Sequence, residues 1–321
     1  MPVDVSPLIH IEMTVRDAEA AYQFLHDVFG AEKVEEEFAS FLDGPGARVI
    51  HVGLGDVVLQ FIEPRVEEGS WHEQLKRSGP GVHNLTFVVD DIREAVKRLE
   101  AEGAPVLFSF PLDWAQLVGP DNVKPDAQPV HMVGSMEQIG FHLELAESPL
   151  KQPPPPAPRE VVGGVSPLLH VEIVVRDVDE TCRFLHAVFG AERVEKEFAS
   201  FLDSPFMKIA HVLLGDVVLQ LCQPLAQAGS WYEQLRDSGP GVHNITFLVD
   251  DLAKVAEAMD RQGVAPLLTF PLDWGQLVGP ENVRPDLPNV HMMNSREKLG
   301  FNLELAERPT DDLSAFLYKA V

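Results

Sequence analysis

The chain has 321 residues, of which 50 are acidic and 25 are basic, so its formal net charge is −25. This charge argues against binding to nucleic acid or to an anionic membrane surface, and the 45% hydrophobic content suffices for about two domains with real cores. Two cysteines predict no disulfide framework, and the absence of a signal peptide or an apolar run of about 18 residues predicts a cytoplasmic protein.

The first quarter of the chain predicts a β-α-β-β-β module. Pro7–Val15 alternates apolar and polar residues, as a strand does. Asp17 is placed to cap a helix and Gly30 to end it. Three strand-like runs follow, over Lys33–Leu42, Ala47–Leu54 and Val57–Glu63.

The second quarter repeats this pattern after one or two helical turns at Trp71–Arg77. His83–Val89 reads as a strand, Asp91 with Glu94 resembles a capping box, and Gly103 is placed to stop the helix. Further strands are expected at Val106–Phe110, Val130–Val133 and Phe141–Leu145. The long segment Pro111–Pro129 between them is typical of a functional lid.

The second half of the chain duplicates the first. Ser166–Pro309 repeats Ser6–Pro149 with a constant offset of 160 and no insertion. We therefore expect a first domain at 1–150, a proline-rich linker at 151–164, a second domain at 165–309 and a tail helix at 310–321.

Polar residues occupy one face of four predicted strands in each half. Successive strand residues face opposite sides of a sheet, and the apolar set must pack against the helices. By this alternation His83 faces the helices, whereas the polar set lines the other face. That set is His10, Glu12, Thr14, Gln60, Asn84, Thr86, His142 and Glu144, and it recurs as His170, Glu172, Gln220, Asn244, Thr246 and Glu304, with Asn302 in place of His142.

This combination of imidazole, carboxylate and amide groups suits a divalent cation of intermediate hardness. A hydrogen-bonded polar pocket that binds an organic ligand without metal is the alternative, and the spacing does not decide between them.

The chain resembles the vicinal oxygen chelate superfamily, which includes glyoxalases, bleomycin resistance proteins and extradiol dioxygenases. The resemblance rests on His10–Asp17, Gly55–Gln60, Gly79–Asn84 and Gly140–Leu145. It implies an α+β fold in which four βαβββ modules pair into two cup-shaped mixed sheets with helices on the outer face.

The resemblance also implies one metal ligand from each of four strands. The matching positions are His10, Gln60, Asn84 and Glu144 in the first half, and His170, Gln220, Asn244 and Glu304 in the second. The family usually has His where Asn84 and Asn244 stand. This departure argues against an extradiol dioxygenase, which needs two His and one carboxylate to hold iron(II).

Further residues on the polar face are candidates for catalysis and substrate binding. Glu12 and Glu172 could act as general bases, or instead orient the neighbouring His, and Glu144 and Glu304 complete the catalytic set. Substrate contacts are expected from Thr86 and Thr246 and, in the lid segments, from Trp114 and Trp274.

The sequence thus predicts a metal-dependent enzyme with two equivalent sites per chain. The divalent ion (Mn, Fe, Co, Ni or Zn) would hold two neighbouring oxygens of a small substrate while a carboxylate moves a proton, which is lyase or isomerase chemistry. A ring-cleaving dioxygenase and a non-catalytic binding or resistance protein are the alternatives. A homodimer is compatible with the sequence, and no nucleic acid or membrane partner is expected.

Overall fold

The computed structural model describes residues 3–34, 44–115, 119–151, 160–194, 204–275 and 279–311. Most of the expected strand Lys33–Leu42, most of the proline-rich linker and nearly all of the expected tail helix lie outside these ranges. The domain boundaries therefore stay a prediction. Within the described ranges, no helix is long and apolar enough to cross a membrane.

The described part of the first half contains the other predicted elements with small changes at their ends, together with a 3-10 turn and the short helix α5, which the sequence did not predict. They are β1 (His10–Thr14), α1 (Ala18–Phe29), β2 (Glu32–Lys33), β3 (Ala47–Leu54), β4 (Val57–Pro64), α2 (Ser70–Ser78), β5 (Gly81–Val89), α3 (Ile92–Ala101), β6 (Val106–Phe110), a 3-10 turn (Pro120–Asn122), β7 (Val130–Val133), α5 (Met136–Ile139) and β8 (His142–Glu147).

The second half repeats them in the same order. They are β9 (His170–Val174), α6 (Val178–Phe189), β10 (Met207–Leu214), β11 (Val217–Pro224), α7 (Ser230–Asp237), β12 (Gly241–Val249), α8 (Leu252–Arg261), β13 (Pro266–Phe270), a 3-10 turn (Pro280–Asn282), β14 (Val290–Met293), α10 (Arg296–Leu299) and β15 (Asn302–Glu307).

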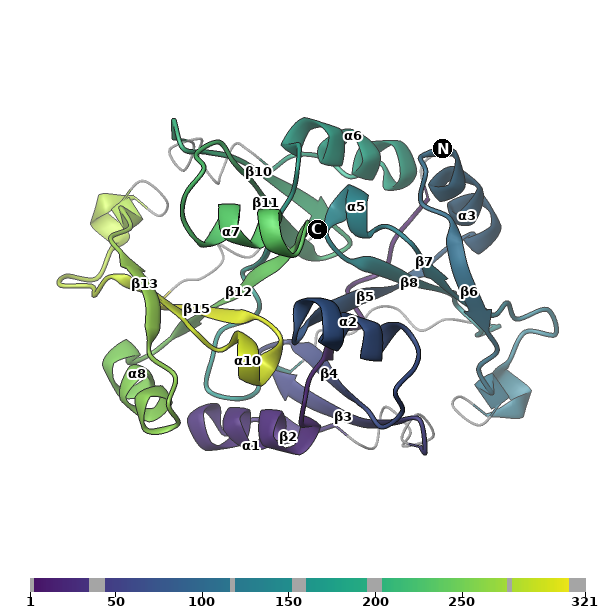
Figure 1. Cartoon of the computed structure of the whole chain (residues 1–321), viewed down its shortest axis with the longest axis horizontal. Coiled ribbons are helices and arrows are strands. Elements are labelled where there is room, and N and C mark those ends of the chain that lie inside the picture. The colour runs from purple at the N-terminus through teal and green to yellow at the C-terminus, as the bar shows by residue number, and fades with distance from the viewer. Residues whose placement is uncertain are drawn as a thin grey trace.

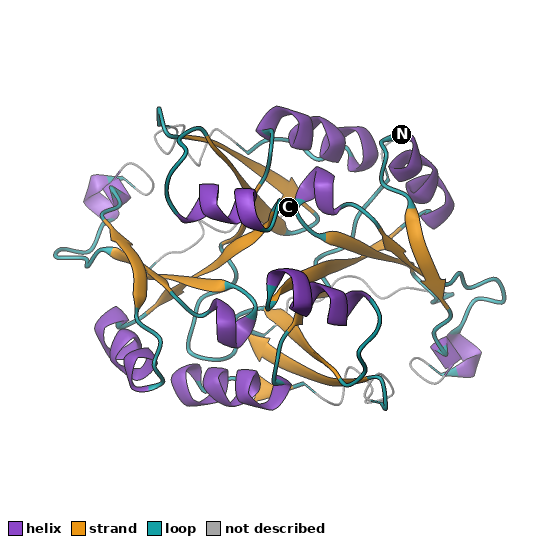
Figure 2. Ribbon diagram, viewed as in Figure 1, coloured by secondary structure: helices purple, strands orange, loops and turns teal. Residues whose placement is uncertain are grey.

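Each half forms one mixed sheet. The strand order is β2-β3-β4-β1-β5-β8-β7-β6 in the first sheet and β10-β11-β9-β12-β15-β14-β13 in the second, so the two orders agree except for β2. The antiparallel pairs β1–β5 and β9–β12 join the two modules of each half. Figure 2 shows the strands at the centre with helices around them. The predicted α+β fold of four paired βαβββ modules is confirmed.

The helix ends follow from local sequence. Asp17 has extended backbone angles, and its side chain accepts a hydrogen bond from Ala20 N at the start of α1, while Gly30 ends α1 in the left-handed conformation. Asp91 caps α3 in the same way by accepting from Glu94 N. The predicted capping roles of both aspartates are confirmed.

A continuous hydrophobic core joins the two halves. Helix α1 packs against α8 of the second half, and α3 packs against α6, as Figure 1 shows along its lower and upper edges. Core residues of both halves, Phe87 and Phe247 among them, belong to one buried cluster. The two sheets are therefore packed on one shared hydrophobic core.

Candidate active site

The register of four adjacent strands gathers the predicted polar residues. Glu12 on β1 lies beside Gln60 on β4 and beside Asn84 on β5. Thr86 on β5 lies between His10 on β1 and Glu144 on β8. The alternate residues of these strands, such as Ile11 and Phe87, are buried in the hydrophobic core. The polar set therefore shares the face opposite the main helices, as the alternation predicts.

A hydroxyl links the imidazole and the carboxylate of the first site. Thr86 Oγ1 lies 2.9 Å from His10 Nε2 and donates to Glu144 Oε1 at 3.3 Å. The second site repeats this arrangement, with Thr246 Oγ1 2.9 Å from His170 Nε2 and 3.4 Å from Glu304 Oε1. The pairs His10–Glu144 and His170–Glu304 therefore each converge on one threonine hydroxyl.

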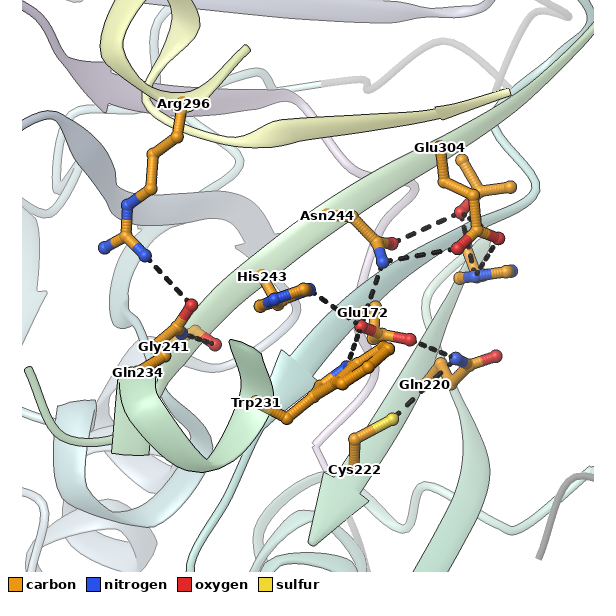
Figure 3. A network of polar contacts seen from close by, with 12 residues as sticks. Glu172, Gln220, Cys222, Trp231, Gln234, Gly241, His243, Asn244, Arg296 and Glu304 are labelled. Carbon is orange, nitrogen blue, oxygen red and sulfur yellow. Dashed lines mark hydrogen bonds and ion pairs between the residues drawn. The ribbon is translucent and has the colours of Figure 1, made fainter. Parts of the chain in front are cut away.

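A second carboxylate lies on the same face under a short helix. Helix α2 contacts β1, β4 and β5, and its Trp71 donates from Nε1 to Glu12 Oε1 at 2.7 Å. In the second half Trp231 on α7 donates to Glu172 Oε1 at 2.6 Å (Figure 3). Trp71 therefore holds Glu12, and the repeated Gly-Ser-Trp at 69–71 and 229–231 was the available signal in the sequence.

The predicted orientation of His83 is wrong. Its Nδ1 lies 3.0 Å from Glu12 Oε1, on the polar face, and 2.9 Å from Asn84 Oδ1. The cause is a β-bulge: Glu12 pairs with Asn84 whereas Met13 pairs with Val82, so His83 is an extra residue. The same register shift leaves His243 Nδ1 3.2 Å from Glu172 Oε1.

The two amides of each predicted metal set are engaged with neighbouring side chains. Gln60 Nε2 lies 2.8 Å from His51 Nε2, and Asn84 Nδ2 donates to Thr86 Oγ1 at 3.2 Å. In the second half Gln220 Nε2 donates to Glu172 Oε2 at 2.6 Å, and its Oε1 lies 2.9 Å from His211 Nε2.

Asn244 connects the two carboxylates of the second site. Its Nδ2 donates to Glu172 Oε1 at 2.9 Å and to Glu304 Oε2 at 3.4 Å, so one amide group bridges both acids (Figure 3). The amides therefore act as hydrogen-bonding partners of the carboxylates and imidazoles.

The two carboxylates of each site have different electrostatic environments. Burial, together with the negative charge of Glu12, raises the pKa of Glu144 to about 8. Burial and the charge of Glu172 raise the pKa of Glu304 to about 8 in the same way. Burial alone would also raise the pKa of Glu172, but hydrogen bonds and charge from His243 and the donor Trp231 outweigh it and lower that pKa.

The pKa values of the imidazoles are also shifted in opposite directions. Burial lowers the pKa of His170 to about 3, and the neighbouring His211 adds to this effect. Burial would also lower the pKa of His83, but its contact with the Glu12 carboxylate raises it above the ordinary value. His170 is therefore a neutral nitrogen donor at pH 7, whereas at His83 the Glu12 contact outweighs the effect of burial.

Two donors of the second predicted metal set fit a divalent ion. His170 Nε2 and Glu304 Oε1 are 4.0 Å apart, within reach of one cation with bonds of about 2.1 Å to each. Among the described residues, no three His, Cys, Asp or Glu side chains form a group that could hold a metal ion. An ion at this site would therefore rely on the imidazole and the carboxylate, with amide, substrate or water oxygens for the rest of its shell.

The predicted lid tryptophan of the second half lies at one end of the polar face. Trp274 is buried in a small cluster with Leu248 and Ala306, which lie two residues beyond Thr246 and Glu304 and so share their face. Trp274 and other residues from 271–275 and 283–289 line a hollow of about 370 Å³. Trp114 donates to Gln128 O at 3.4 Å. A substrate contact for either tryptophan stays a prediction.

The two sites differ in composition. His142 in the first half corresponds to Asn302, Ile62 to Cys222 and Thr14 to Val174. Cys222 is buried, with Sγ 3.8 Å from Gln220 Nε2 (Figure 3). The halves therefore repeat the fold and the carboxylate pair but not every side chain around them.

Comparison with known proteins supports the resemblance seen in the sequence. The model of the Glyoxalase/Bleomycin resistance protein/Dioxygenase superfamily matches residues 9–113 and again residues 169–271. Mouse mitochondrial methylmalonyl-CoA epimerase is 30% identical over 121 residues, which cover 33% of this chain and 66% of the mouse protein. The uncharacterized Bacillus subtilis (strain 168) protein YqjC is 23% identical over 140 residues, covering 44% of this chain and 91% of YqjC.

Solved structures share the fold along the whole chain. A variant of 4-hydroxymandelate synthase from Streptomyces coelicolor has a TM-score of 0.59 at 18% identity, and the match covers 98% of this chain and 96% of the synthase. The Mn(II)-bound glyoxalase from Novosphingobium aromaticivorans has a TM-score of 0.56 at 13% identity, covering 96% and 83%.

Proposed function

This chain belongs to the Glyoxalase/Bleomycin resistance protein/Dioxygenase superfamily, and from that premise we propose that its polar faces catalyse proton transfer on a small carbonyl-containing substrate. The reaction class is that of an isomerase or lyase. The superfamily contains metal-dependent glyoxalases, epimerases and dioxygenases, so membership of it does not by itself identify the reaction.

The observation that carries the proposal is the pair of buried carboxylates in each half. In the second half the pKa of Glu172 is lowered and that of Glu304 is raised to about 8. Two neighbouring acids whose pKa values are pushed apart are suited to act as base and acid near neutral pH. Glu12 and Glu144 occupy the matching positions of the first half.

In the proposed mechanism the ionised carboxylate is held in place by the tryptophan and histidine donors. Glu172 accepts a proton from the carbon beside the substrate carbonyl, while Trp231 and His243 hold its Oε1. Glu304, protonated in the metal-free site, can return a proton to the opposite position. Glu12 and Glu144 take the corresponding roles in the first half. Burial excludes water and strengthens these interactions.

A divalent ion fits the His10–Glu144 and His170–Glu304 pairs, with Gln60, Asn84, Gln220 and Asn244 as weaker donors. When bound, such an ion supplies electrostatic stabilisation of the negative charge that develops on the substrate. It would also favour the ionised form of Glu144, so the metal and the proton compete for that carboxylate.

Two observations favour isomerase or lyase chemistry over the alternatives. The epimerase relative is an isomerase by name. Asn84 and Asn244 stand where the family usually has its second metal-binding His, while His83 and His243 contact Glu12 and Glu172 rather than the His–Glu pairs. The 4-hydroxymandelate synthase neighbour keeps oxygenase chemistry as the second candidate. A metal-free binding protein is the third.

Metal analysis of the purified protein tests the proposal. We expect about two equivalents of transition metal at the two His–Glu pairs of the wild type, and loss of both from these pairs in the Glu144→Ala Glu304→Ala variant. The matched control is Glu137→Ala Glu297→Ala, which removes a duplicated pair of exposed carboxylates from α5 and α10. Equal metal content in the folded wild type and the Glu144→Ala Glu304→Ala variant would favour the metal-free binding protein.

A further inference from the structure

Two neighbouring imidazoles of the first half each have a buried nitrogen without a hydrogen-bond partner. These atoms are His83 Nε2 and His142 Nδ1. The rings lie side by side, with centroids 5.2 Å apart and planes tilted by 59°. A buried polar atom without a partner is costly, so two of them side by side indicate a ligand between the rings.

The other nitrogen of His83 is already held by the protein. His83 Nδ1 lies 3.0 Å from Glu12 Oε1, and because a carboxylate only accepts, the proton of that contact belongs to the imidazole. Metal-binding histidines are oriented in this way, by a carboxylate or a backbone carbonyl on the ring nitrogen that does not bind the metal. Burial lowers the pKa of His142 to about 4, so this imidazole is neutral at pH 7.

We propose that His83 Nε2 and His142 Nδ1 bind one divalent transition-metal ion, at a site distinct from the His10–Glu144 pair. Imidazole nitrogen selects Cu(II), Ni(II) or Zn(II) over magnesium and calcium. Two rings that share such an ion through bonds of about 2.1 Å have centres roughly 5 to 6 Å apart, which the observed separation satisfies. Water or a small ligand completes the shell from the partly exposed side of His142.

The second half provides an internal comparison. Asn302 replaces His142, and the ring of His243 stacks on Trp231 with centroids 4.9 Å apart and planes 20° apart. In the first half Trp71 and His83 are farther apart, at 6.3 Å and 60°. The proposed site therefore occurs once per chain, whereas the His10–Glu144 pair occurs twice.

Copper titration of the chelator-treated full-length protein tests this site, because Cu(II) binds imidazole strongly and its electron paramagnetic resonance spectrum reports the number of bound nitrogens. We expect one Cu(II) with two imidazole nitrogens per wild-type chain. The His142→Asn variant, which copies the second half, should lose this signal. The matched control Asn302→Ala should keep it.

A second arm separates this site from the proposed catalytic metal. The Glu144→Gln Glu304→Gln variant removes a carboxylate from both His–Glu pairs and should still show the two-nitrogen signal. Three results would each overturn the inference: a signal retained in folded His142→Asn protein, no signal in the wild type, or a signal lost in the Glu144→Gln Glu304→Gln variant. Unchanged metal content at the His–Glu pairs of the Glu144→Gln Glu304→Gln variant would instead count against the proposed function.

Discussion

At the scale of single residues, the site depends on carboxylates taken out of water. Glu144 and Glu304 lie on the same face as a second acid, and both burial and that neighbouring charge oppose their ionisation. Each acid is therefore protonated in the metal-free folded state at a pH where the unfolded chain has lost the proton. Stability consequently depends on pH.

We predict that the contribution of Glu144 and Glu304 to the free energy of unfolding of the chelator-treated wild type falls as pH rises from about 5 to about 8. The folded-state pKa values of about 8 lie above the ordinary value of 4.5, so the stabilising contribution is present at low pH and lost as pH rises. The Glu144→Gln Glu304→Gln variant should gain stability relative to wild type at pH 8, by roughly 1 to 3 kcal/mol per carboxyl.

Denaturant unfolding at several pH values measures this difference. The exposed pair Glu137→Gln Glu297→Gln should follow the wild-type curve throughout the range. Parallel curves for the Glu144→Gln Glu304→Gln variant and the wild type would show that these two carboxyls ionise normally.

At the scale of elements, helices α2 and α7 each place a tryptophan over the polar face. Neither has a side-chain N-cap, since each begins after a glycine in the left-handed region, and they contact the strands that carry Glu12 and Glu172. The hydrogen bond from the indole Nε1 to the carboxylate thus connects each helix to the site.

We predict that Trp231→Phe lowers the free energy of unfolding at pH 7 by about 1 to 3 kcal/mol, because a buried carboxylate loses a donor. The pKa of Glu172 is lowered in the folded state, so its stabilising contribution is present at neutral pH and lost in acid. The deficit of the variant should therefore shrink below about pH 4. Trp114→Phe removes a bond to a neutral backbone carbonyl, and its deficit should not vary with pH. A pH-independent loss in Trp231→Phe would contradict the carboxylate contact.

The strands illustrate what alternation can and cannot predict. It placed His10, Thr86 and Glu144 on one face, because a regular strand alternates its side chains. It failed at His83, because a bulge depends on how β5 pairs with β1, and neither strand alone records the extra residue. The hydrogen bonds of Gln60 and Asn84 likewise depend on neighbours from other strands, so their partners could not be predicted.

At the scale of the molecule, the duplication made it possible to predict the fold. The contact between the halves could not be predicted, because the alternation of residues along each strand carries no information about it. Gly55 shows how close that contact is. Its φ is +61°, and an added Cβ would lie 2.5 Å from Ser166 O and 2.8 Å from a ring carbon of Phe247. Glycine is thus required by backbone conformation and by the opposite half.

We predict that Gly55→Ala lowers the free energy of unfolding by roughly 2 to 5 kcal/mol, the sum of left-handed strain and overpacking. Gly30→Ala is the matched control, since its φ is +72° but nothing lies within 4 Å of the added Cβ. It should cost only the strain, about 1 to 2 kcal/mol. Similar losses for the two variants would mean that the halves do not pack closely at Gly55.

The central claim is that the buried carboxylate pairs move a proton at carbon, and hydrogen–deuterium exchange tests it most directly. Wild-type protein and the Glu144→Ala Glu304→Ala variant would be incubated in deuterium oxide with methylmalonyl-CoA and other compounds that carry a C–H bond beside a carbonyl. NMR then measures deuterium incorporation at that carbon. We predict exchange of at least one such compound by the wild type, slowed by about 100-fold or more in the folded variant. Equal exchange by both proteins, or no exchange of any compound by the wild type, would contradict the account.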